Sequence, residues 1–529
     1  MILKVKNVLT SSCLLLCLFV VSRSAGHAAT PVQIENERPG TTAWQLSNPA
    51  DSLEIEGYAS LTSVNRGGQI SFFVNTSDPG FTIDIYRMGW YGGDGARLVK
   101  GGITGPGVRQ PMPEPDPLTG LIECDWAESV TITTSNPEDD TDWLSGVYLA
   151  KLTGGISGKQ SYIMFVVRDD ERGSDYLFQS SVTTFQAYNN WGGKSLYQFN
   201  TVGPPARKVS FNRPYAPSEN PQAAYGNGAA DFLTGMGMQA GWEYNMVRWL
   251  ERNGYDVTYS TNIDTHGDPT FWKGRKAWLS VGHDEYWSWE MREHVEQARD
   301  RGVGLGFFSG NVCYWQIRLE TSSVTAQPYR TMVAYKTVED DPYAIDDDPG
   351  NDQRVTTRWR EAPVNLPEES FIGVMYESDP VDADVIITDP GHWVLSGTGL
   401  KEGDRLPGLL GYEVDRTFGH APPGTAVIAH SPYRFGDGTR YADMASYTTA
   451  AGTTVFATGT IQWSWGLDDF NAPRLRSSRL SQAAEQITRN VLARLVGGTF
   501  SAATFHASGN ATTHVTLHLD GAASLASRP

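Results

Sequence analysis

Two apolar runs separated by one helix-length segment constrain the fold of this chain more than any other feature. The runs KAWLSV (276–281) and VGLGFFS (303–309) have the length and composition of buried strands. Between them, EMREHVEQARDRG (290–302) has the pattern of an amphipathic helix that ends at Gly302. A strand, a helix and a second strand in succession predict a right-handed crossover within a parallel sheet.

The same alternation continues on both sides of this unit. VTTFQAY (182–188) and YDVTYST (255–261) are predicted strands, and WEYNMVRWLERNG (242–254) is a predicted helix. The run from 480 to 498 predicts a long closing helix, whereas residues from about 320 to 470 mix acidic loops with strand-like runs. We therefore expect residues 173–498 to form an α/β domain with an irregular β-containing insert at about 320–470.

The part of the chain before residue 173 has a different pattern. Short strands with alternating apolar and polar residues are separated by Gly, Pro, Asn and Asp, and no helical period interrupts them. The strand-like runs are GGQISFFVN, FTIDIYRMGWY, ESVTITTS, SGVYLAKLT and KQSYIMFVV. Residues 30–172 are therefore predicted to be an all-β, immunoglobulin-like sandwich.

The N-terminal residues 1–29 have the layout of a secretory signal peptide: two lysines, a short apolar run and small residues at the exit. No later segment is apolar enough for a transmembrane anchor, so we expect a secreted protein, extracellular or periplasmic. Without residues 1–29 the chain keeps 39 basic and 60 acidic residues, a net charge of about −21. This charge argues against nucleic acid and anionic membranes as partners.

Three smaller features of the sequence concern the cysteines, the C-terminal residues and an acidic loop. Cys124 and Cys313 are the cysteines that remain after residues 1–29, and their spacing does not decide whether they pair. The Ala/Thr/Ser-rich residues 499–529 are expected to be a tail. The acidic loop 339–352 lacks the pattern of a calcium loop, which favours a solvated surface.

The stretch WLSVGHDEYWS (278–288) places polar residues where the first of the two strands ends. Ligands of open parallel sheets bind beyond the carboxyl ends of the strands. His283 and Glu285 follow one strand, Asn311 follows its expected neighbour, and Tyr188 ends another predicted strand. We therefore predict a hydrolytic or metal site on this rim, with a hydrogen-bonded turn as the alternative.

Known motifs narrow the chemistry of this rim. The chain has no HExxH, HxH, CxxC or GxSxG pattern. At the elbow between strand and helix, His283-Asp284-Glu285 stands where a Ser or Cys nucleophile would be expected, which favours a metal or water-activating site. Carboxylate and phenolate oxygens select hard cations, and phenolate suits ferric iron. Asp284 is predicted to be structural, and Ser288 is the predicted N-cap of the following helix.

Several segments resemble the large (beta) subunit of N,N-dimethylformamidase and its relatives, and together they extend over most of residues 55–470. The segments are IDIYRMGWYGGDGARLV, TTFQAYNNWGGKSLY, VSFNRPY, LSVGHDEYWSWEMR, FFSGNVCYWQIR and LPGLLGYEVD. The resemblance implies an amide hydrolase on a glutamine-amidotransferase-like (flavodoxin-like) α/β domain. It also implies a mononuclear Fe³⁺ site held by two tyrosinates and one glutamate.

The motifs that match the family imply which residues of this chain form the site. Glu285 is the implied glutamate ligand, with Tyr188 as the first and Tyr215 as the second choice of tyrosine; Tyr197 and Tyr225 stay open. The implied catalytic residues are His283, Glu413, Asn311 and Lys336. In this interpretation His283 or Glu413 moves protons, while Asn311 and Lys336 stabilise the charge on the oxygen of a small amide substrate.

Two departures and one alternative remain. The formamidase acts with a separate small subunit, so a small partner subunit or a homo-oligomer is expected here. An exported protein meets different substrates from a cytoplasmic enzyme, which leaves the amide substrate open. The alternative is an extracellular carbohydrate- or ligand-binding protein on a degenerate enzyme fold, since 16 tryptophans and 23 tyrosines offer rings that stack on sugars.

Overall fold

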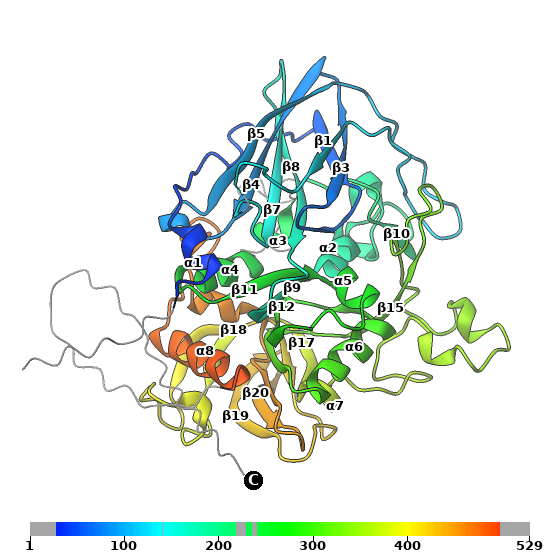
Figure 1. Cartoon of the computed structure of the whole chain (residues 1–529). Coiled ribbons are helices and arrows are strands. Elements are labelled where there is room, and N and C mark those ends of the chain that lie inside the picture. Colours follow the sequence, from blue (N-terminus) through cyan, green and yellow to red (C-terminus); the bar gives the residue numbers. More distant parts are fainter. Residues whose placement is uncertain (1–27, 140, 218–228, 235–240, 498–529) are drawn as a thin grey trace, which may run out of the picture.

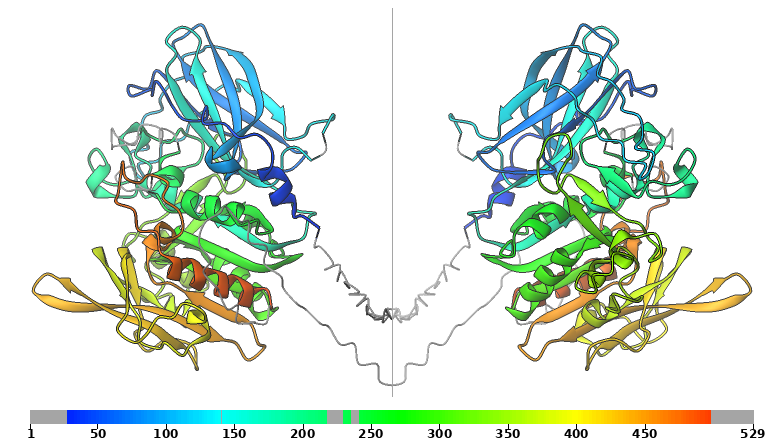
Figure 2. Two further views of the ribbon diagram at one scale, coloured as in Figure 1. Left: turned by 90° about the vertical axis from the view of Figure 1, so that its left-hand side faces the viewer. Right: turned by 90° about the vertical axis from the view of Figure 1, so that its right-hand side faces the viewer.

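The computed structural model describes residues 28–139, 141–217, 229–234 and 241–497. Two N-terminal β-sheets lie at one end of the molecule, a sheet flanked by helices lies in the middle, and long hairpins lie at the other end (Figures 1 and 2). The chain is therefore a strand-rich α/β protein. The predicted tail, and all but the last two residues of the predicted signal peptide, lie outside the described residues.

The two N-terminal sheets share one core. One sheet has the order β1 (Ile55–Ala59), β3 (Gln69–Thr76), β6 (Val130–Thr133), and the other has the order β2 (Ser63–Asn65), β8 (Gln160–Arg168), β7 (Gly146–Gly154), β4 (Gly80–Met88), β5 (Ala96–Pro106). Phe72 of the first sheet and Ile83 and Phe165 of the second are buried in the same cluster. All five strands predicted before residue 173 are confirmed, as β3, β4, β6, β7 and β8.

The central sheet has seven strands. The first five pair in parallel, and the sixth pairs antiparallel with both the fifth and the seventh. Their order is β11 (Val257–Thr261), β9 (Ser174–Ser180), β12 (Arg275–His283), β14 (Gly304–Gly310), β21 (Thr454–Ala457), β20 (Gly438–Thr448) and β19 (Ala426–Phe435). The predicted parallel pairing of the strands at 276–281 and 303–309 is confirmed as β12 and β14. The insert predicted at about 320–470 thus contributes three strands to this sheet.

Side chains alternate between the two faces of the central sheet, as the strand period requires. Trp278 and Phe307 pack in one buried cluster with residues of α6 (Trp289–Asp300) and α7 (Glu369–Ile372). Their neighbours Leu279 and Phe308 pack in the other cluster with residues of α4 (Glu243–Arg252) and α8 (Gln482–Leu495). Helices therefore cover both faces of the sheet.

The predicted helices of this region are confirmed as α4, α6 and α8. Ser288 is the N-cap of α6, as predicted, because its hydroxyl accepts a hydrogen bond from the backbone N–H of Met291. The remaining α-helices are α1 (Pro31–Asn36), α2 (Val182–Tyr188), α3 (Ala230–Leu233) and α5 (Asn262–Gly267). Short 3-10 helices lie at Tyr91–Gly93, Trp191–Gly193, Gln198–Asn200, Pro342–Ala344, Asp352–Arg354, Trp393–Leu395 and Ile461–Gly466.

The prediction of a strand at VTTFQAY is wrong, because these residues form helix α2 and the strand is the preceding β9. β-branched residues favour strands through their packing, and tertiary contacts override that preference here. The Thr183 hydroxyl donates a hydrogen bond to the backbone oxygen of Tyr286, and the Thr184 hydroxyl accepts one from the backbone N–H of Glu285. The two threonines thus dock the helix on the corner that follows β12.

Two smaller sheets complete the fold. One has the order β10 (Lys208–Ser210), β16 (Thr331–Val333), β15 (Trp315–Glu320), β13 (Tyr286–Ser288), and the other is the hairpin-like pair β17 (Met375–Ile386) and β18 (Arg405–Arg416). β13 begins three residues after β12 ends, so this sheet continues from the rim of the central one. β18 also contacts β14 and β20, which brings its residues to the same rim.

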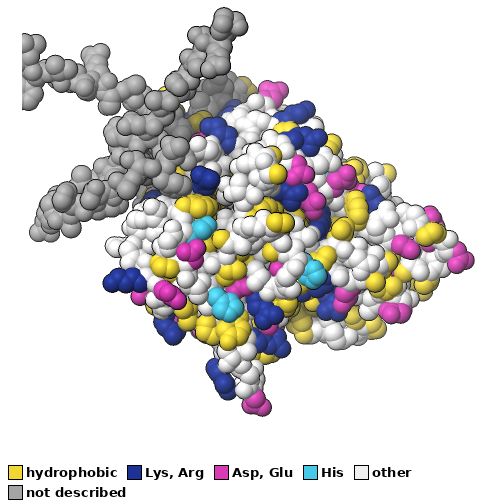
Figure 3. All heavy atoms as spheres, turned by 90° about the horizontal axis from the view of Figure 1, so that it is seen from below, with side chains coloured by type: hydrophobic (Ala, Val, Ile, Leu, Met, Phe, Trp, Pro, Cys, Tyr) yellow, Lys and Arg dark blue, Asp and Glu magenta, His cyan; other side chains and the backbone are white. Residues whose placement is uncertain are grey.

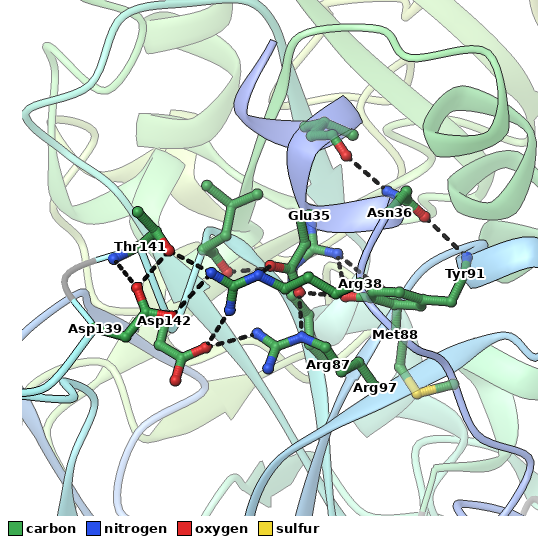
Figure 4. A network of polar contacts seen from close by, with 12 residues as sticks. Glu35, Asn36, Arg38, Arg87, Met88, Tyr91, Arg97, Asp139, Thr141 and Asp142 are labelled. Carbon is green, nitrogen blue, oxygen red and sulfur yellow. Dashed lines mark hydrogen bonds and ion pairs between the residues drawn. The ribbon is translucent and has the colours of Figure 1, made fainter. Parts of the chain in front are cut away.

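A buried ion pair joins the N-terminal sheets to helix α4. Arg87 of β4 and Glu251 of α4 are fully buried, and the two Nη atoms lie 2.7 and 2.9 Å from the carboxylate oxygens. Tyr91 accepts a hydrogen bond from Arg87 and donates one to Glu35 of α1, so the network reaches the first described helix (Figure 4). This arrangement links three segments that are distant in the sequence.

Among the described residues, the cysteines and the helices give no sign of a disulfide or a membrane span, and the charges on one face of the surface form no patch of a single sign. Cys124 and Cys313 are both free and buried. Within the described ranges, no helix combines the length and apolar character needed to cross a membrane. On the face seen in Figure 3, basic and acidic side chains are interspersed rather than gathered by sign.

Candidate active site

The corner between β12 and β13 is shaped by a glycine. Gly282 has φ of 73°, and a Cβ atom there would lie 2.8 Å from the Cβ of Trp242. Only glycine adopts this conformation freely and leaves that space. The backbone N–H of Glu285 then donates to the Thr184 hydroxyl, and its carbonyl accepts hydrogen bonds from the N–H groups of Tyr314 and Trp315. The corner is thereby held from both sides.

Two tyrosines converge on the carboxylate of Glu285. The hydroxyl of Tyr188, the last residue of α2, lies 2.9 Å from Oε2 of Glu285. The hydroxyl of Tyr197 lies 2.9 Å from both Oε1 and Oε2. The two phenol rings stack with centroids 4.2 Å apart. Burial, and then the neighbouring charge of Glu285, raises the pKa of both hydroxyls well above the usual value.

A third tyrosine belongs to the same group. The hydroxyl of Tyr286 lies 2.6 Å from that of Tyr197 and donates a hydrogen bond to it. Tyr286 immediately follows Glu285 in the sequence but was not among the residues predicted for the site. Strand β13 is buried along its whole length, so alternation does not distinguish Tyr286 from the neighbouring Trp287.

His283 lies between two buried glutamates. Its Nε2 atom is 3.3 Å from Oε2 of Glu285 and 3.1 Å from Oε2 of Glu413, which comes from β18. Burial alone would lower the pKa of His283, but the nearby carboxylates, first Glu413 and then Glu285, raise it well above the usual value. Burial raises the pKa of Glu413, and the charge of His283 opposes that shift. The charge of each group thus favours the charged form of the other.

Asn311 connects the end of β14 to β18. Its Nδ2 atom donates to Oε2 of Glu413 at 2.5 Å, and its backbone N–H donates to Oδ1 of Asp415 at 2.7 Å. Gly310 allows this approach, because a Cβ atom there would lie 2.8 Å from the backbone oxygen of Glu413. Asn311 has φ of 52°, a conformation that asparagine tolerates better than most residues. Its Oδ1 atom is buried and finds no hydrogen-bond partner among the residues that the structure describes.

Lys336 lies on the other side of Tyr197. Its Nζ atom is 3.5 Å from the centroid of the Tyr197 ring and donates to the backbone oxygen of Leu196 at 3.1 Å. Burial lowers the pKa of Lys336 to about 7, although the charge of Glu285 opposes this shift. The ammonium group is thus close to the cluster without forming an ion pair with Glu285.

Asp284 points into a different environment, as expected for a structural residue. Its carboxylate is fully buried and accepts hydrogen bonds from Gln179, Asn262 and Ser280 at 2.9, 2.9 and 3.0 Å. Burial raises the pKa of this carboxyl group. Successive residues of the corner therefore divide their roles: Asp284 holds the strands and helix α5 together, and Glu285 faces the tyrosines.

The structure brings together six of the seven residues predicted for the site. Tyr188, His283, Glu285, Asn311, Lys336 and Glu413 all lie in or beside this cluster. Tyr215 instead lines a small cavity beside the N-terminal sheets, together with Glu56 and Gly57, and has no contact with Glu285 among the described residues. Tyr197, which the sequence left open, takes the place beside Tyr188. Tyr225 lies outside the described residues.

The donor set is unlike that of common protein metal sites. Across the described ranges, no group of three or more His, Cys, Asp or Glu side chains is arranged to hold a metal ion. The cluster instead presents the carboxylate of Glu285 and the hydroxyl oxygens of Tyr188 and Tyr197. Each hydroxyl oxygen lies 2.9 Å from a carboxylate oxygen. These three groups would carry three negative charges when the phenols are ionised.

Comparison with known proteins identifies the family. A search of curated proteins finds no match. The family model described as N,N-dimethylformamidase beta subunit-like, C-terminal, matches residues 82–477, which include β4, the central sheet and every residue of the cluster. The chain therefore belongs to the N,N-dimethylformamidase beta subunit-like family.

Proposed function

We propose that this chain is a secreted hydrolase of amide C–N bonds that binds one ferric ion through Tyr188, Tyr197 and Glu285. The observation that carries the proposal is the convergence of two phenol hydroxyls on one buried carboxylate at the carboxyl rim of a parallel sheet. Ionised phenols and a carboxylate are hard oxygen donors, and phenolate in particular suits Fe³⁺. Their three negative charges balance the charge of that ion.

The raised pKa of the two phenols fits this assignment. Both hydroxyls are buried beside a carboxylate, so ionisation needs a compensating positive charge at the same place. A trivalent cation held by Tyr188, Tyr197 and Glu285 would supply that charge. When bound there, ferric iron supplies Lewis acidity, which polarises an amide carbonyl.

His283 and Glu413 are proposed to move the protons of the reaction. Hydrolysis adds water to the carbonyl carbon, and one proton must leave the water while another reaches the departing amine nitrogen. Glu413 has a raised pKa and lies 3.1 Å from Nε2 of His283, so a proton taken from water can pass between them. The imidazolium of His283 is then the donor to the amine.

Asn311 and Lys336 are proposed to bind the oxygen on which negative charge develops. The Nδ2 group of Asn311 has a second hydrogen beyond the one given to Glu413, and the ammonium of Lys336 has donors beyond the one given to Leu196. Preorganised donors of this kind stabilise a tetrahedral oxyanion more than the planar amide. Lys336, with its pKa lowered to about 7, is poised for this role near neutral pH.

Finer features of the fold and of the cellular context are also proposals. The two N-terminal sheets support an immunoglobulin-like sandwich, and the parallel strands with helices on both faces support a glutamine-amidotransferase-like domain. Export rests on the composition of residues 1–29. A small partner subunit is proposed because the family description names a beta subunit.

The choice between Tyr197 and Tyr215 gives the first test. We expect Tyr197→Phe to reduce iron content and amide hydrolysis by at least about 100-fold, because one of three ligands is lost. The matched variant Tyr215→Phe removes a hydroxyl that lies elsewhere and should retain the iron and most of the activity. Metal analysis and initial rates measure both variants. The reverse order of effects would reassign the ligand to Tyr215.

The proposed function as a whole is tested on the purified protein. We expect about one iron per chain, a visible absorption band from charge transfer between phenolate and iron, and release of amine from a panel of small amides. A protein that contains no iron and hydrolyses none of these amides would contradict the proposal. Glycan binding that persists after iron removal would favour the binding-protein alternative.

A further inference from the structure

A bulge in β17 brings another carboxylate to the candidate active site. The register between β17 and β18 passes from the pair Ser378–Val414 to the pair Val381–Tyr412. Two residues of β17, Asp379 and Pro380, therefore stand opposite the single residue Glu413. Bulges of this kind often lie beside active sites, where they redirect a side chain.

Asp379 is less buried than Glu413, which stands opposite it in the ladder. Asp379 is half-buried, as are Tyr376 of β17 and Tyr412 of β18, whereas Glu413 is buried. Burial raises the pKa of Asp379, a hydrogen bond from Tyr376 opposes that shift, and the charge of Glu285 raises it further. The charge of Asp379 in turn raises the pKa of Glu413, Tyr376 and Tyr412, in keeping with its place opposite Glu413.

No basic residue neutralises Asp379. Arg416 and Arg440, which reach this part of β17, lie 3.7 Å from the carboxylate of the neighbouring Glu377 instead. Within the part of the chain that the structure describes, no lysine, arginine or histidine forms an ion pair with Asp379. The charge of His283 lowers the pKa of Asp379, but the imidazole itself lies against Glu285 and Glu413.

Asp379 forms no ion pair among the described residues. It is half-buried, as are two tyrosines of the same strand pair, Tyr376 three residues earlier on β17 and Tyr412 next to Glu413 on β18. A half-buried carboxylate with aromatic neighbours is a favourable environment for an organic cation.

We propose that Asp379 is a specificity-determining residue and that it binds a positively charged group, an ammonium or guanidinium, on the amide that the enzyme hydrolyses. This inference rests on the proposed function for the chemistry of the site, but its evidence is the position of Asp379. The cation would pair with Asp379 and relieve its repulsion with Glu285. The amide carbon would lie deeper, toward Asn311 and Lys336.

Matched amides test the inference on the iron-containing protein. 6-Aminohexanamide and heptanamide differ in that an ammonium replaces a methyl group at the end of the chain, and 4-aminobutanamide and pentanamide form a shorter pair. For each compound we also include the derivative with two methyl groups on the amide nitrogen. We expect kcat/KM to be about tenfold higher for the cationic member of at least one pair, mainly through a lower KM. In Asp379→Asn the ratio of kcat/KM for the cationic amide to kcat/KM for the neutral amide should fall to about one. The kcat for the neutral amides should be retained.

Asp382→Asn is the matched control. Asp382 is an exposed acidic residue of the same strand that pairs with Arg479, so its replacement removes one negative charge away from the site. The control should keep the preference for cationic amides. Equal rates for both members of every pair in the wild-type protein, or the same preference in Asp379→Asn, would overturn the inference.

Binding separates this inference from the proposed function. If none of the amides is hydrolysed, the proposed function fails, and ligand-observed NMR with 6-aminohexanamide and heptanamide still tests Asp379. Stronger binding of the cationic amide to the wild-type protein than to Asp379→Asn would support the inference. Equal binding by the two proteins would contradict it.

Discussion

Glu285→Gln is expected to lose both the iron and amide hydrolysis, with a fall in kcat/KM of about three orders of magnitude or more. The substitution keeps the size of the side chain but removes the negative charge that faces Tyr188 and Tyr197. A neutral amide is a much poorer ligand for a hard cation than a carboxylate. Metal analysis, the visible absorption spectrum and initial rates measure the effect.

Glu296→Gln is the control for this variant. Glu296 is a half-buried residue of α6 that pairs with Arg292 and does not touch the residues of the cluster, so its replacement should leave iron and activity unchanged. Circular dichroism establishes that both variants are folded. A folded Glu285→Gln protein with full iron content and wild-type rates would rule out Glu285 as a ligand.

Glu251→Gln is expected to lower the free energy of unfolding by about 3–5 kcal/mol, because it leaves the guanidinium of Arg87 buried without its charge partner. The loss is large because both side chains are completely buried where β4 meets α4. Urea denaturation measures the effect.

Two comparisons make the stability prediction specific. Glu485→Gln breaks a partly exposed pair with Arg489 and should cost less than about 1 kcal/mol. The double variant Arg87→Met/Glu251→Leu removes both charges and should cost less than the sum of Glu251→Gln and Arg87→Met. Equal losses in Glu251→Gln and Glu485→Gln would contradict the assigned role of the buried pair.

The rim of the central sheet could be predicted from the sequence because it depends on local patterns. The apolar runs of β12 and β14 and the helix between them fix a parallel pair, and the carboxyl ends of parallel strands lie at one edge. His283, Glu285 and Asn311 follow directly from this arrangement. Each of these residues directly follows a strand or lies within two residues of its end, so its position does not depend on the path of a long loop.

The tyrosine pair could not be fixed in this way. Tyr188 was assigned to the site through a strand that is in fact helix α2. Two hydrogen bonds hold this helix to the distant corner: Thr183 donates to the backbone oxygen of Tyr286, and Thr184 accepts from the backbone N–H of Glu285. Tyr197 reaches Glu285 through an irregular segment whose course has no periodic signal. The sequence therefore favoured Tyr215 as the second tyrosine and left Tyr197 open, whereas Tyr197 is the residue that meets Glu285.

Glu413 and Asp379 depend on long-range packing that the sequence does not express. Asp379 lies on β17 and Glu413 on β18, and the register of these two strands changes at the bulge beside Glu413. The contact of Glu413 with His283 and Asn311 requires β18 to pack against β14, through the space that Gly310 leaves open. A pairing between segments about 100 residues apart has no local pattern from which it can be predicted.

Anomalous X-ray scattering at the iron absorption edge, from crystals of the purified protein, tests the central claim most directly. The account predicts one strong peak per chain at bonding distance from the hydroxyl oxygens of Tyr188 and Tyr197 and from the carboxylate of Glu285. The peak should disappear in Glu285→Gln crystals. Wild-type crystals with no peak there, or with iron bound elsewhere in the chain, would contradict it.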